Sequence, residues 1–498
     1  MKNSSSLALA RTLCVVFITA AVSACSVTAP TTSNELPAYR ALNRLPLDIC
    51  KLDGIEEPLL CGTLDVYENR LKMSGTKIPI KFVVIPAIDE PHTNSAWIEH
   101  VGGPRYSMIA NARYFAKGGY LEVFRQRRDV VLIDPRGLHE SSPLYCEALS
   151  KPRILQRYYP PKAVKACRGE LEDKADLSAY STLNAIDDYE EIRKWLGYAQ
   201  WDVGGWSYGA RFMLTYLHTY PQSIRSVILA MPSILNFQRP LDYARFGQQA
   251  FDRLELDCQQ DAQCHANFPN VRQSLNAVLT KLDKHPVKID FFNPDSGKVE
   301  SRILTRDIFA ESIWVMLLDT REARQLPFIL SQAVAGDFSP FIDLAVPKSP
   351  QQSEPEGHYF SVVCPEETGQ LDQAITSVAS KDTFVGNYIA KDYIEACEAW
   401  GLPLSPNHPM TKKRFPTPAL IITGEQDPVT PPVYGEINAE HFDNVLHISL
   451  PHTAHGISAL KNTHCLPQFL NGFVESASLD NLDMSCVRGF KPPAFRLD

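Results

Sequence analysis

The sequence has no dense run of lysine or arginine, no low-complexity stretch and no internal repeat. Its formal net charge of −8 argues against a nucleic acid as partner. No Cys-x-x-Cys pair occurs, and the close pair Cys258 and Cys264 has the wrong spacing for a common zinc knuckle. We therefore expect no metal site and no cofactor. With 498 residues, 44% of them hydrophobic and 21% charged, the chain has the composition of a globular protein.

The N-terminal 24 residues have the pattern of an export signal. Lys2 and Arg11 precede an apolar stretch over 13–22. This stretch is too short for a membrane-spanning helix. The following letters, VSAC, resemble the lipobox of bacterial lipoproteins, in which the cysteine becomes the lipidated first residue. We expect a signal peptide over 1–24, a lipid anchor at Cys25 and a tether with an N-terminal segment over 25–60. A plain secretory signal is the alternative.

Ten further cysteines follow Cys25, and an even number of cysteines in an exported chain indicates disulfides. Spacing does not determine their connectivity. We predict sequential pairs that close short loops: Cys50–Cys61, Cys146–Cys167, Cys258–Cys264, Cys364–Cys397 and Cys465–Cys486. Export and lipidation together predict a location on the periplasmic or outer-membrane face.

Short apolar runs alternate with amphipathic ones between about residues 78 and 235. Strand patterns occur at 80–87, 96–101, 129–134, 201–206 and 226–231, and helical patterns at 183–197 and 210–221. This alternation predicts an α/β fold, with a mostly parallel central sheet flanked by helices.

A different pattern follows. Helical periodicity dominates from about 236 to 400, with only 287–293 resembling a strand, and the strand–helix alternation returns at 418–425 and 444–450. We expect a core in two parts, 61–235 and 406–498, with an inserted, mainly helical cap over 236–405. The second core part includes a C-terminal segment.

Ser207 lies in the stretch WDVGGWSYGARF, where a strand pattern leads through G-x-S-x-G into a helical pattern. At such an elbow a serine nucleophile takes a strained backbone conformation, and glycines are needed because side chains would collide with the strand and helix. The helix N-terminus favours the negative charge that develops there. We predict that Ser207 is a nucleophile.

A serine nucleophile requires a base and an acid that orients the base. In this type of fold the order along the chain is serine, acid, histidine. Asp427 follows the strand pattern at 418–425, and His455 follows the next one at 444–450, so both are predicted at the sheet edge that carries Ser207. Glu425 and His452 are the alternatives for the acid and the base.

An oxyanion needs two backbone N–H donors. The residue after the nucleophile, Tyr208, is one expected donor. The glycine-rich turn at Gly102 and Gly103, directly after the strand pattern at 96–101, is the expected source of the other.

Five motifs, HVGGPR, DPRGLHESS, GGWSYG, GEQDPVTPP and HTAHG, resemble in order and spacing the α/β-hydrolase family of proline iminopeptidases and tripeptidyl aminopeptidases. The segments SVVCPEE, ACEAW and CLPQFLNGF are similar to the tripeptidyl-aminopeptidase branch. The chain departs from the family at Arg105, where glycine is usual, and at Pro135, Leu138 and His139.

The resemblance implies a serine exopeptidase acting on peptides with free N-termini, with Ser207, Asp427 and His455 as the triad. It also implies a cap whose acidic side chains hold the substrate's ammonium group, for which Glu366 and Glu367 are the expected residues. A carboxylesterase using the same triad, or a surface lipoprotein using the fold only for binding, are the alternatives. The sequence leaves the oligomeric state open.

Overall fold

The computed structural model describes residues 47–90, 94–151, 153–405, 413–480 and 482–498. The chain divides into two units, residues 1–36 and 37–498, and all described residues lie in the second. The expected signal peptide and the expected lipid anchor at Cys25 lie outside the described residues.

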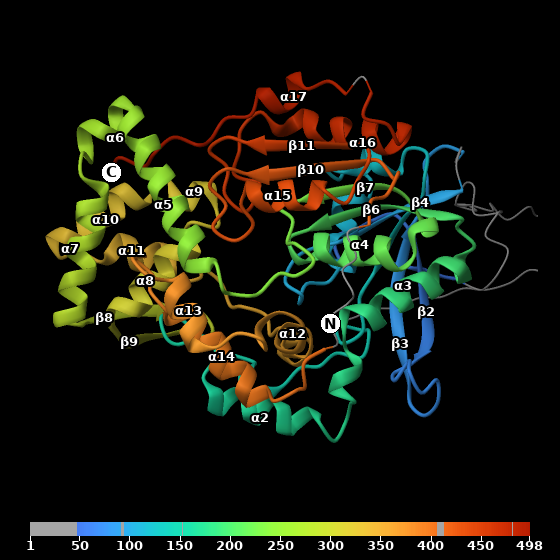
Figure 1. Cartoon of the computed structure of the whole chain (residues 1–498), viewed down its shortest axis with the longest axis horizontal. Coiled ribbons are helices and arrows are strands. Elements are labelled where there is room, and N and C mark those ends of the chain that lie inside the picture. The colour runs from blue at the N-terminus through green and yellow to red at the C-terminus, as the bar shows by residue number, and fades with distance from the viewer. Residues whose placement is uncertain (1–46, 91–93, 152, 406–412, 481) are drawn as a thin grey trace, which may run out of the picture. The chain divides into compact units, whose positions relative to one another are not determined.

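A nine-stranded sheet forms the centre of the second unit (Figure 1). Its strand order is β1-β2-β3-β5-β4-β6-β7-β10-β11. From β5 to β11 all neighbours are parallel, whereas β1, β2, β3 and β5 pair antiparallel. The strands are β1 (Asp48–Cys50), β2 (Leu59–Tyr67), β3 (Lys77–Ile85), β4 (Ser95–His100), β5 (Val130–Ile133), β6 (Gln200–Trp206), β7 (Ile224–Ala230), β10 (Ala419–Gly424) and β11 (Val445–Leu450).

The central strands are apolar along nearly their whole length because helices cover the sheet. Every residue of β5 (VVLI) and of β10 (ALIITG) is buried. Continuous burial of this kind is typical of parallel strands with both faces covered. These runs are the ones that the sequence predicted as strands. β1 and β2 were not predicted; β2 (LLCGTLDVY) carries Gly62 and Asp65, which are residues depleted in strands.

The helices of the core follow the strands in sequence. α3 begins after Ser181, whose hydroxyl accepts a hydrogen bond from the Asn184 N–H, and ends at Gly197 in a left-handed conformation. The helices outside residues 236–405 are α1 (Ala112–Phe115), α2 (Pro161–Leu171), α3 (Thr182–Leu196), α4 (Tyr208–Thr219), α15 (Pro432–Ala439), α16 (Leu466–Ser476) and α17 (Ser485–Arg488).

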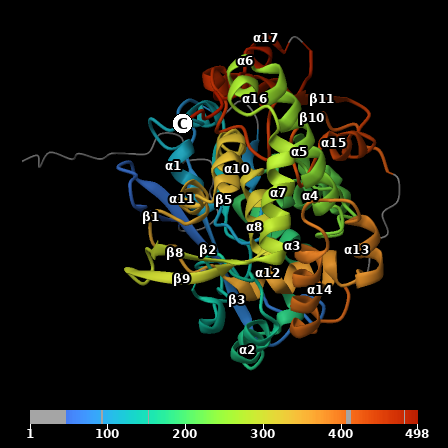
Figure 2. The ribbon, with the colours of Figure 1, turned by 90° about the vertical axis from the view of Figure 1, so that its left-hand side faces the viewer.

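A mainly helical segment is inserted between β7 and β10, and we keep the name cap for residues 236–405 (Figures 1 and 2). It holds α5 (Tyr243–Gln260), α6 (Ala262–Asn267), α7 (Val271–Lys284), α8 (Arg306–Met316), α9 (Thr320–Ala323), α10 (Leu326–Ala335), α11 (Ser339–Ala345), α12 (Glu356–Val363), α13 (Gln373–Ala379) and α14 (Tyr388–Trp400). It also holds an antiparallel hairpin of β8 (Val287–Asn293) and β9 (Lys298–Leu304).

The sequence predicted β8 but missed β9. Four of the seven residues of β9 (KVESRIL) are charged or hydroxylated, and most of the strand is exposed, so its hydrophobic pattern is weak. The hairpin is nevertheless complete, since β9 pairs with β8 along its full length.

The cap has an apolar core of its own, which includes Phe251, Phe309 and Ile313. Residues from outside 236–405 join this core: Ile154, which precedes α2, and Phe495 near the C-terminus. The cap is therefore built from more of the chain than the sequence pattern indicated.

Candidate active site

Ser207 lies at the sharp turn between β6 and α4. Its backbone has φ 55° and ψ −119°, a conformation that L-residues rarely adopt and that is typical of functional sites. A Cβ on Gly209 would lie 1.7 Å from the His100 carbonyl oxygen, and one on Gly205 would lie 2.5 Å from the Ala210 Cα. Only glycine fits at these two positions, so the spacing G-x-S-x-G is a steric requirement of this turn.

His455 and Asp427 form a hydrogen-bonded row with Ser207. His455 Nε2 lies 3.0 Å from Ser207 Oγ, and His455 Nδ1 lies 2.7 Å from Asp427 Oδ2. Because an ionised carboxylate can only accept, this geometry assigns the proton to Nδ1 and leaves Nε2 free to accept the serine hydroxyl. The structure thus brings together the three residues that the sequence selected.

Asp427 is buried and held by several donors. The N–H groups of Val429 and Thr430 donate to its Oδ1 at 2.8 and 2.9 Å, and the Thr430 hydroxyl donates to its Oδ2 at 2.8 Å. Burial raises the pKa of Asp427, but the attraction of His455 and these hydrogen bonds outweigh it, so the pKa is below its ordinary value. Asp427 therefore stays ionised beside His455.

The two alternative residues lie apart from this row. Glu425 faces Arg253, with 3.7 Å between Oε2 and Nη1, and is partly exposed. His452 Nδ1 lies 2.7 Å from Asp257 Oδ2, on α5 of the cap. Neither side chain is hydrogen-bonded to Ser207.

Gly102 approaches Ser207 closely. A Cβ on Gly102 would lie 3.0 Å from Ser207 Cβ and 3.4 Å from Oγ, so the loop after β4 passes directly beside the serine. Gly103 has φ 119° and precedes a cis peptide bond to Pro104. Tyr208 is the first residue of α4, directly after Ser207. This placement is compatible with the oxyanion role predicted for Gly102, Gly103 and Tyr208, which stays a prediction.

Arg105, one of the departures from the family pattern, anchors this loop to the cap. Its Nη1 atom donates to Glu354 at 2.9 Å and to Glu356 at 2.8 Å, and its Nη2 atom donates to the Tyr159 hydroxyl at 2.6 Å. The guanidinium also stacks on the Tyr359 ring at 4.0 Å. Sequence reasoning marked Arg105 as unusual but did not find these partners, which are distant in sequence.

Glu366 and Glu367 lie in a buried ion-pair network rather than on an open surface. Glu367 Oε1 accepts from Arg211 at 3.0 Å and its Oε2 accepts from Arg239 at 2.7 Å. Glu366 Oε2 accepts from Arg211 at 3.0 Å and from the Thr182 hydroxyl at 2.6 Å. Because Arg211 and Thr182 belong to α4 and α3, the two glutamates join the cap to the core.

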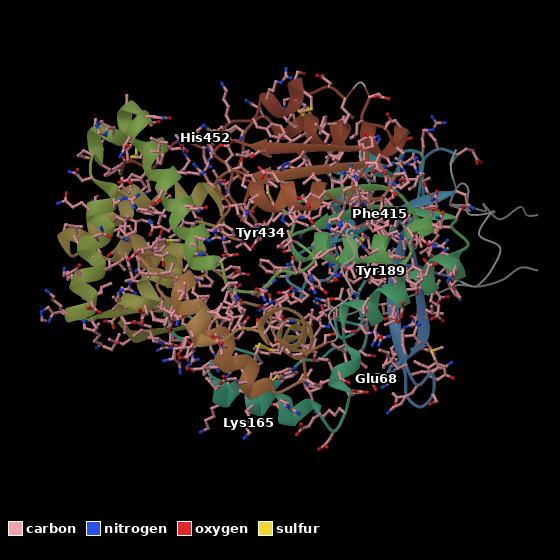
Figure 3. All side chains as sticks on the ribbon, viewed as in Figure 1. Glu68, Lys165, Tyr189, Phe415, Tyr434 and His452 are labelled. Carbon is pink, nitrogen blue, oxygen red and sulfur yellow. A yellow bond between two sulfur atoms is a disulfide. The ribbon has the colours of Figure 1, made fainter. Side chains whose placement is uncertain are left out.

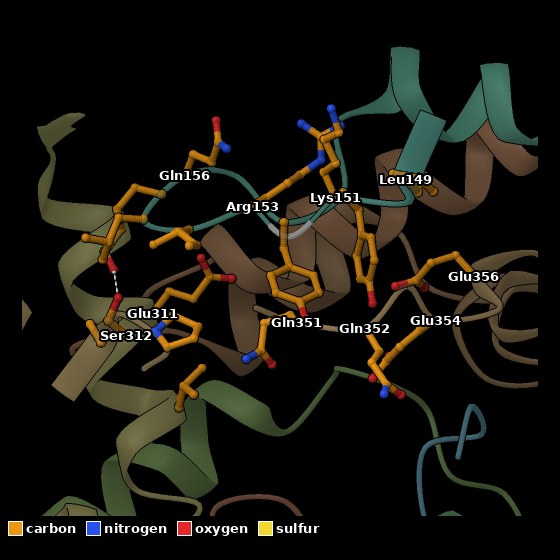
Figure 4. A pocket seen from close by; sticks show the side chains of 18 of the residues that line it. Leu149, Lys151, Arg153, Gln156, Glu311, Ser312, Gln351, Gln352, Glu354 and Glu356 are labelled. Atoms are coloured by element: carbon orange, nitrogen blue, oxygen red, sulfur yellow. Dashed lines mark hydrogen bonds between the residues drawn. The ribbon is translucent and has the colours of Figure 1, made fainter. Parts of the chain in front are cut away.

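A cavity of about 410 Å³ lies between α8, the segment 149–159 and the segment 351–356 (Figure 4). Four glutamates line it together with two tyrosines: Glu311, Glu322, Glu354, Glu356, Tyr158 and Tyr159. Figure 4 shows Glu311 on one side, and Glu354 and Glu356 on the other. One of its lining residues, Glu356, is a hydrogen-bond partner of Arg105 in the loop after β4.

Burial raises the pKa of the carboxyl groups of Glu311 and Glu356. Burial, with Asp392 and Asp307 nearby, raises the pKa of Glu311 to about 8 against the opposing effect of Arg157. Burial also raises the pKa of Glu356, although Arg105 acts in the other direction. The buried Oε2 atom of Glu356 has no hydrogen-bond partner among the described residues. Four carboxyl groups thus line the cavity against two cationic side chains, those of Lys151 and Arg153.

All five disulfides have the predicted connectivity. Cys364–Cys397 joins the π-helical turn Cys364–Thr368, which carries Glu366 and Glu367, to α14. The pairs are Cys50–Cys61, Cys146–Cys167, Cys258–Cys264, Cys364–Cys397 and Cys465–Cys486. Five bonds of this kind favour an exported protein.

None of the helices in the described residues is long and apolar enough to cross a membrane. Within the same residues, no group of three or more histidine, cysteine, aspartate or glutamate side chains is arranged to hold a metal ion.

Two family models match the chain. One, described as "alpha/beta hydrolase fold", matches residues 108–310 and includes Ser207. The other, described as "TAP-like protein", matches residues 382–486 and includes Asp427 and His455. Together with the sheet topology, these matches confirm the predicted α/β-hydrolase fold.

Three curated proteins are similar to the chain at low identity. Serine protease Hip1 of Mycobacterium tuberculosis is 26% identical over 50% of this chain and 49% of its own length. Putative hydrolase YuaR of Escherichia coli is 22% identical over 64% of this chain and 66% of its own. Proline iminopeptidase of Aeromonas sobria is 27% identical over 39% of this chain and 40% of its own. The matched region thus spans about half the length of Hip1. These similarities support an α/β-hydrolase of the peptidase type.

Proposed function

We propose that this protein is a serine exopeptidase that releases residues or short peptides from the free N-termini of peptides. The observation that carries the proposal is the hydrogen-bonded row Asp427–His455–Ser207 at a strained turn. The peptidase names of Hip1 and the proline iminopeptidase support a peptide substrate.

In the proposed reaction, Ser207 Oγ attacks the carbonyl carbon of the scissile peptide bond while His455 Nε2 takes its proton. Asp427 holds the imidazole with the proton on Nδ1 and stabilises the imidazolium that forms. Backbone N–H groups of Tyr208 and of the loop at Gly102 bind the oxyanion; each such donor is worth about 10²–10³ in kcat.

The same imidazole then completes the cycle. His455 gives its proton to the leaving amine, and the C–N bond breaks to leave an acyl ester on Ser207. A water molecule, deprotonated by His455, attacks this ester and releases the new acid with regeneration of the serine. A non-catalytic surface protein would have no need for this proton pathway.

The proposed selectivity for free N-termini requires a counter-charge for the substrate ammonium group. Glu366 and Glu367 are poor candidates, because Arg211 and Arg239 already neutralise them. We propose instead that the ammonium group binds in the cavity between Glu311 and Glu356. Two observations support this choice: Glu354 and Glu356 share the single countercharge of Arg105, and the buried Oε2 of Glu356 has no hydrogen-bond partner among the described residues.

The test compares three chromogenic substrates with the purified protein: a peptide anilide with a free amine, its N-acetylated twin, and a short acyl ester. The proposal expects cleavage of the free-amine peptide with kcat/KM at least about 10-fold above that of the twin, as expected for a charge-assisted hydrogen bond. Equal cleavage of both peptides would contradict exopeptidase selectivity. Cleavage of the ester alone would make the protein a carboxylesterase.

A further inference from the structure

Asp257 of the cap contacts both loops that carry the acid and the base of the triad. It lies on α5, and its side chain is 10% exposed. Its Oδ2 atom accepts from Gln426 Nε2 at 2.7 Å and lies 2.7 Å from His452 Nδ1. Arg324 of the cap, 3.3 Å away, supplies the countercharge. The Asp257 carboxylate therefore contacts two loops of the core at the same time.

These loops are the ones that position the triad. Gln426 directly precedes Asp427, and His452 is three residues before His455 (Figure 3 labels His452). The Gln426 N–H also donates to the Thr453 carbonyl at 2.8 Å, so the two loops are joined to each other. A shift of Asp257 would act on both at once.

The cap also holds the backbone of the histidine loop. The His455 N–H donates to the Leu318 carbonyl at 3.1 Å, and the Ala454 N–H donates to the Thr320 hydroxyl at 3.0 Å. Leu318 and Thr320 lie at the junction of α8 and α9. The base of the triad is thus attached to the cap by its own main chain.

The backbone at His452 is strained. Its φ of 54° lies in the left-handed region, which a non-glycine residue occupies only when its surroundings enforce it. The contact with Asp257 is a tertiary interaction that holds this residue in place. Without it, we expect the loop to relax and to move His455 relative to Ser207.

We propose that Asp257 is a positioning residue: through Gln426 and His452, the docked cap sets the distance between His455 and Ser207. This inference rests on the proposed serine hydrolase function. A displacement of a catalytic group by about 1 Å can lower the rate about 100-fold. Contacts of Asp257 with the two loops can therefore affect kcat although Asp257 does not touch the substrate.

The test measures how fast Ser207 reacts with a small fluorophosphonate, which needs the triad but no peptide site. Asp257→Ala is compared with wild type and with Asp252→Ala, which removes an exposed aspartate from the same helix. The kcat and KM for the best substrate are measured in parallel, at a temperature at which circular dichroism shows each variant folded.

We expect Asp257→Ala to label at least about 10-fold more slowly and to lose kcat by a similar factor with KM within twofold. Asp257→Asn, which keeps an acceptor oxygen, should regain part of the rate, and Asp252→Ala should match wild type. Labelling of Asp257→Ala within twofold of wild type, with or without a change in KM, would overturn the inference.

If Asp257→Ala does not fold, Gln426→Leu decides, because it removes the Nε2 donor to Asp257 and keeps the carboxylate itself. Slower labelling of that variant supports positioning through Asp257, and an unchanged rate overturns it. A wild-type protein that does not label at all would instead refute the serine hydrolase proposal.

Discussion

His455 Nε2 lies 3.0 Å from Ser207 Oγ although the two residues are 248 positions apart and the whole cap lies between them in sequence. The sheet makes this possible: β7 and β10, which flank the cap in sequence, are hydrogen-bonded neighbours. The insertion therefore leaves the strand order β6-β7-β10-β11 intact. Because these strands are parallel, their carboxyl ends lie at one edge and bring Ser207, Asp427 and His455 together.

Replacement of the serine should abolish hydrolysis without unfolding the protein. Ser207→Ala removes the attacking oxygen, and the loss of a serine nucleophile typically costs about 10⁶-fold in kcat. Steady-state kinetics with the substrate that wild type cleaves best should detect this, and the melting temperature should stay close to that of wild type. Retention of more than about one hundredth of the activity would mean that another residue is the nucleophile.

The two histidines of the loop after β11 should behave differently. His455→Gln should be inactive because an amide cannot take the serine proton. His452→Gln should keep most of the activity, since its amide can still donate to Asp257. Comparison of kcat for the two purified variants measures this difference, and the reverse result would exchange the two roles.

The hydrogen-bonded row of Ser207, His455 and Asp427 could be predicted from sequence because each of the three residues follows the end of a strand pattern. The segments before Ser207, Asp427 and His455 form the strands β6, β10 and β11. The motif G-x-S-x-G has a steric cause, because a side chain at Gly209 would collide with the His100 carbonyl. Patterns of this kind are local, so a single sequence can display them.

The partners of charged residues could not be predicted, because they depend on tertiary contacts. Glu367 meets Arg211 and Arg239 across 156 and 128 positions of sequence, and Asp257 meets His452 across 195. Neither hydrophobic periodicity nor a sequence motif links residues that are so far apart in the chain. For the same reason the sequence selected Glu366 and Glu367 as amine ligands on resemblance alone. The strand β9 was missed for a different reason, since its exposed residues give only a weak hydrophobic pattern.

The ion pairs of Glu367 should contribute more to stability than to substrate binding. Glu367→Gln leaves the buried Arg239 guanidinium without its carboxylate and Arg211 with Glu366 alone, and breaking a buried pair in this way costs about 3–5 kcal/mol. Urea denaturation should show this loss, whereas Glu398→Gln, an exposed position on α14, should unfold like wild type. If Glu367→Gln instead keeps the stability of wild type and loses activity only toward substrates with a free amine, the result supports the amine-binding role that the resemblance implies.

The disulfide Cys364–Cys397 should stabilise the turn that carries Glu366 and Glu367. It closes a loop with a sequence separation of 33, for which chain entropy predicts about 3–4 kcal/mol. The double variant Cys364→Ser/Cys397→Ser should show this decrease in the free energy of unfolding. Peptide mass mapping of wild type should find all five pairs and no free thiol among their ten cysteines; crossed pairs would contradict the structure.

The stability of the protein should depend on Glu311 in a pH range that ordinary glutamates do not reach. Its folded-state pKa of about 8 lies above the unfolded value of about 4.3. The protonated form is thus favoured in the folded state, and this contribution is fully present below about pH 4 and is lost as the pH rises through 8. The free energy of unfolding of Glu311→Gln relative to wild type should therefore increase between pH 5 and pH 9. An unchanged difference would mean that Glu311 has an ordinary pKa.

The same group should control the KM for peptides with a free amine. Only the ionised carboxylate can pair with an ammonium group, so KM should fall as the pH rises toward 8, above which the substrate amine, with a pKa of about 7.7–8.0, loses its own charge. Glu311→Gln should raise KM about 10-fold near pH 8 and remove the fall of KM as the pH rises toward 8. Its kcat should change little, because the triad is untouched, and the N-acetylated twin should show neither effect. A KM that keeps the same pH dependence in Glu311→Gln would place the amine ligand elsewhere, with Glu356 as the next carboxylate to replace.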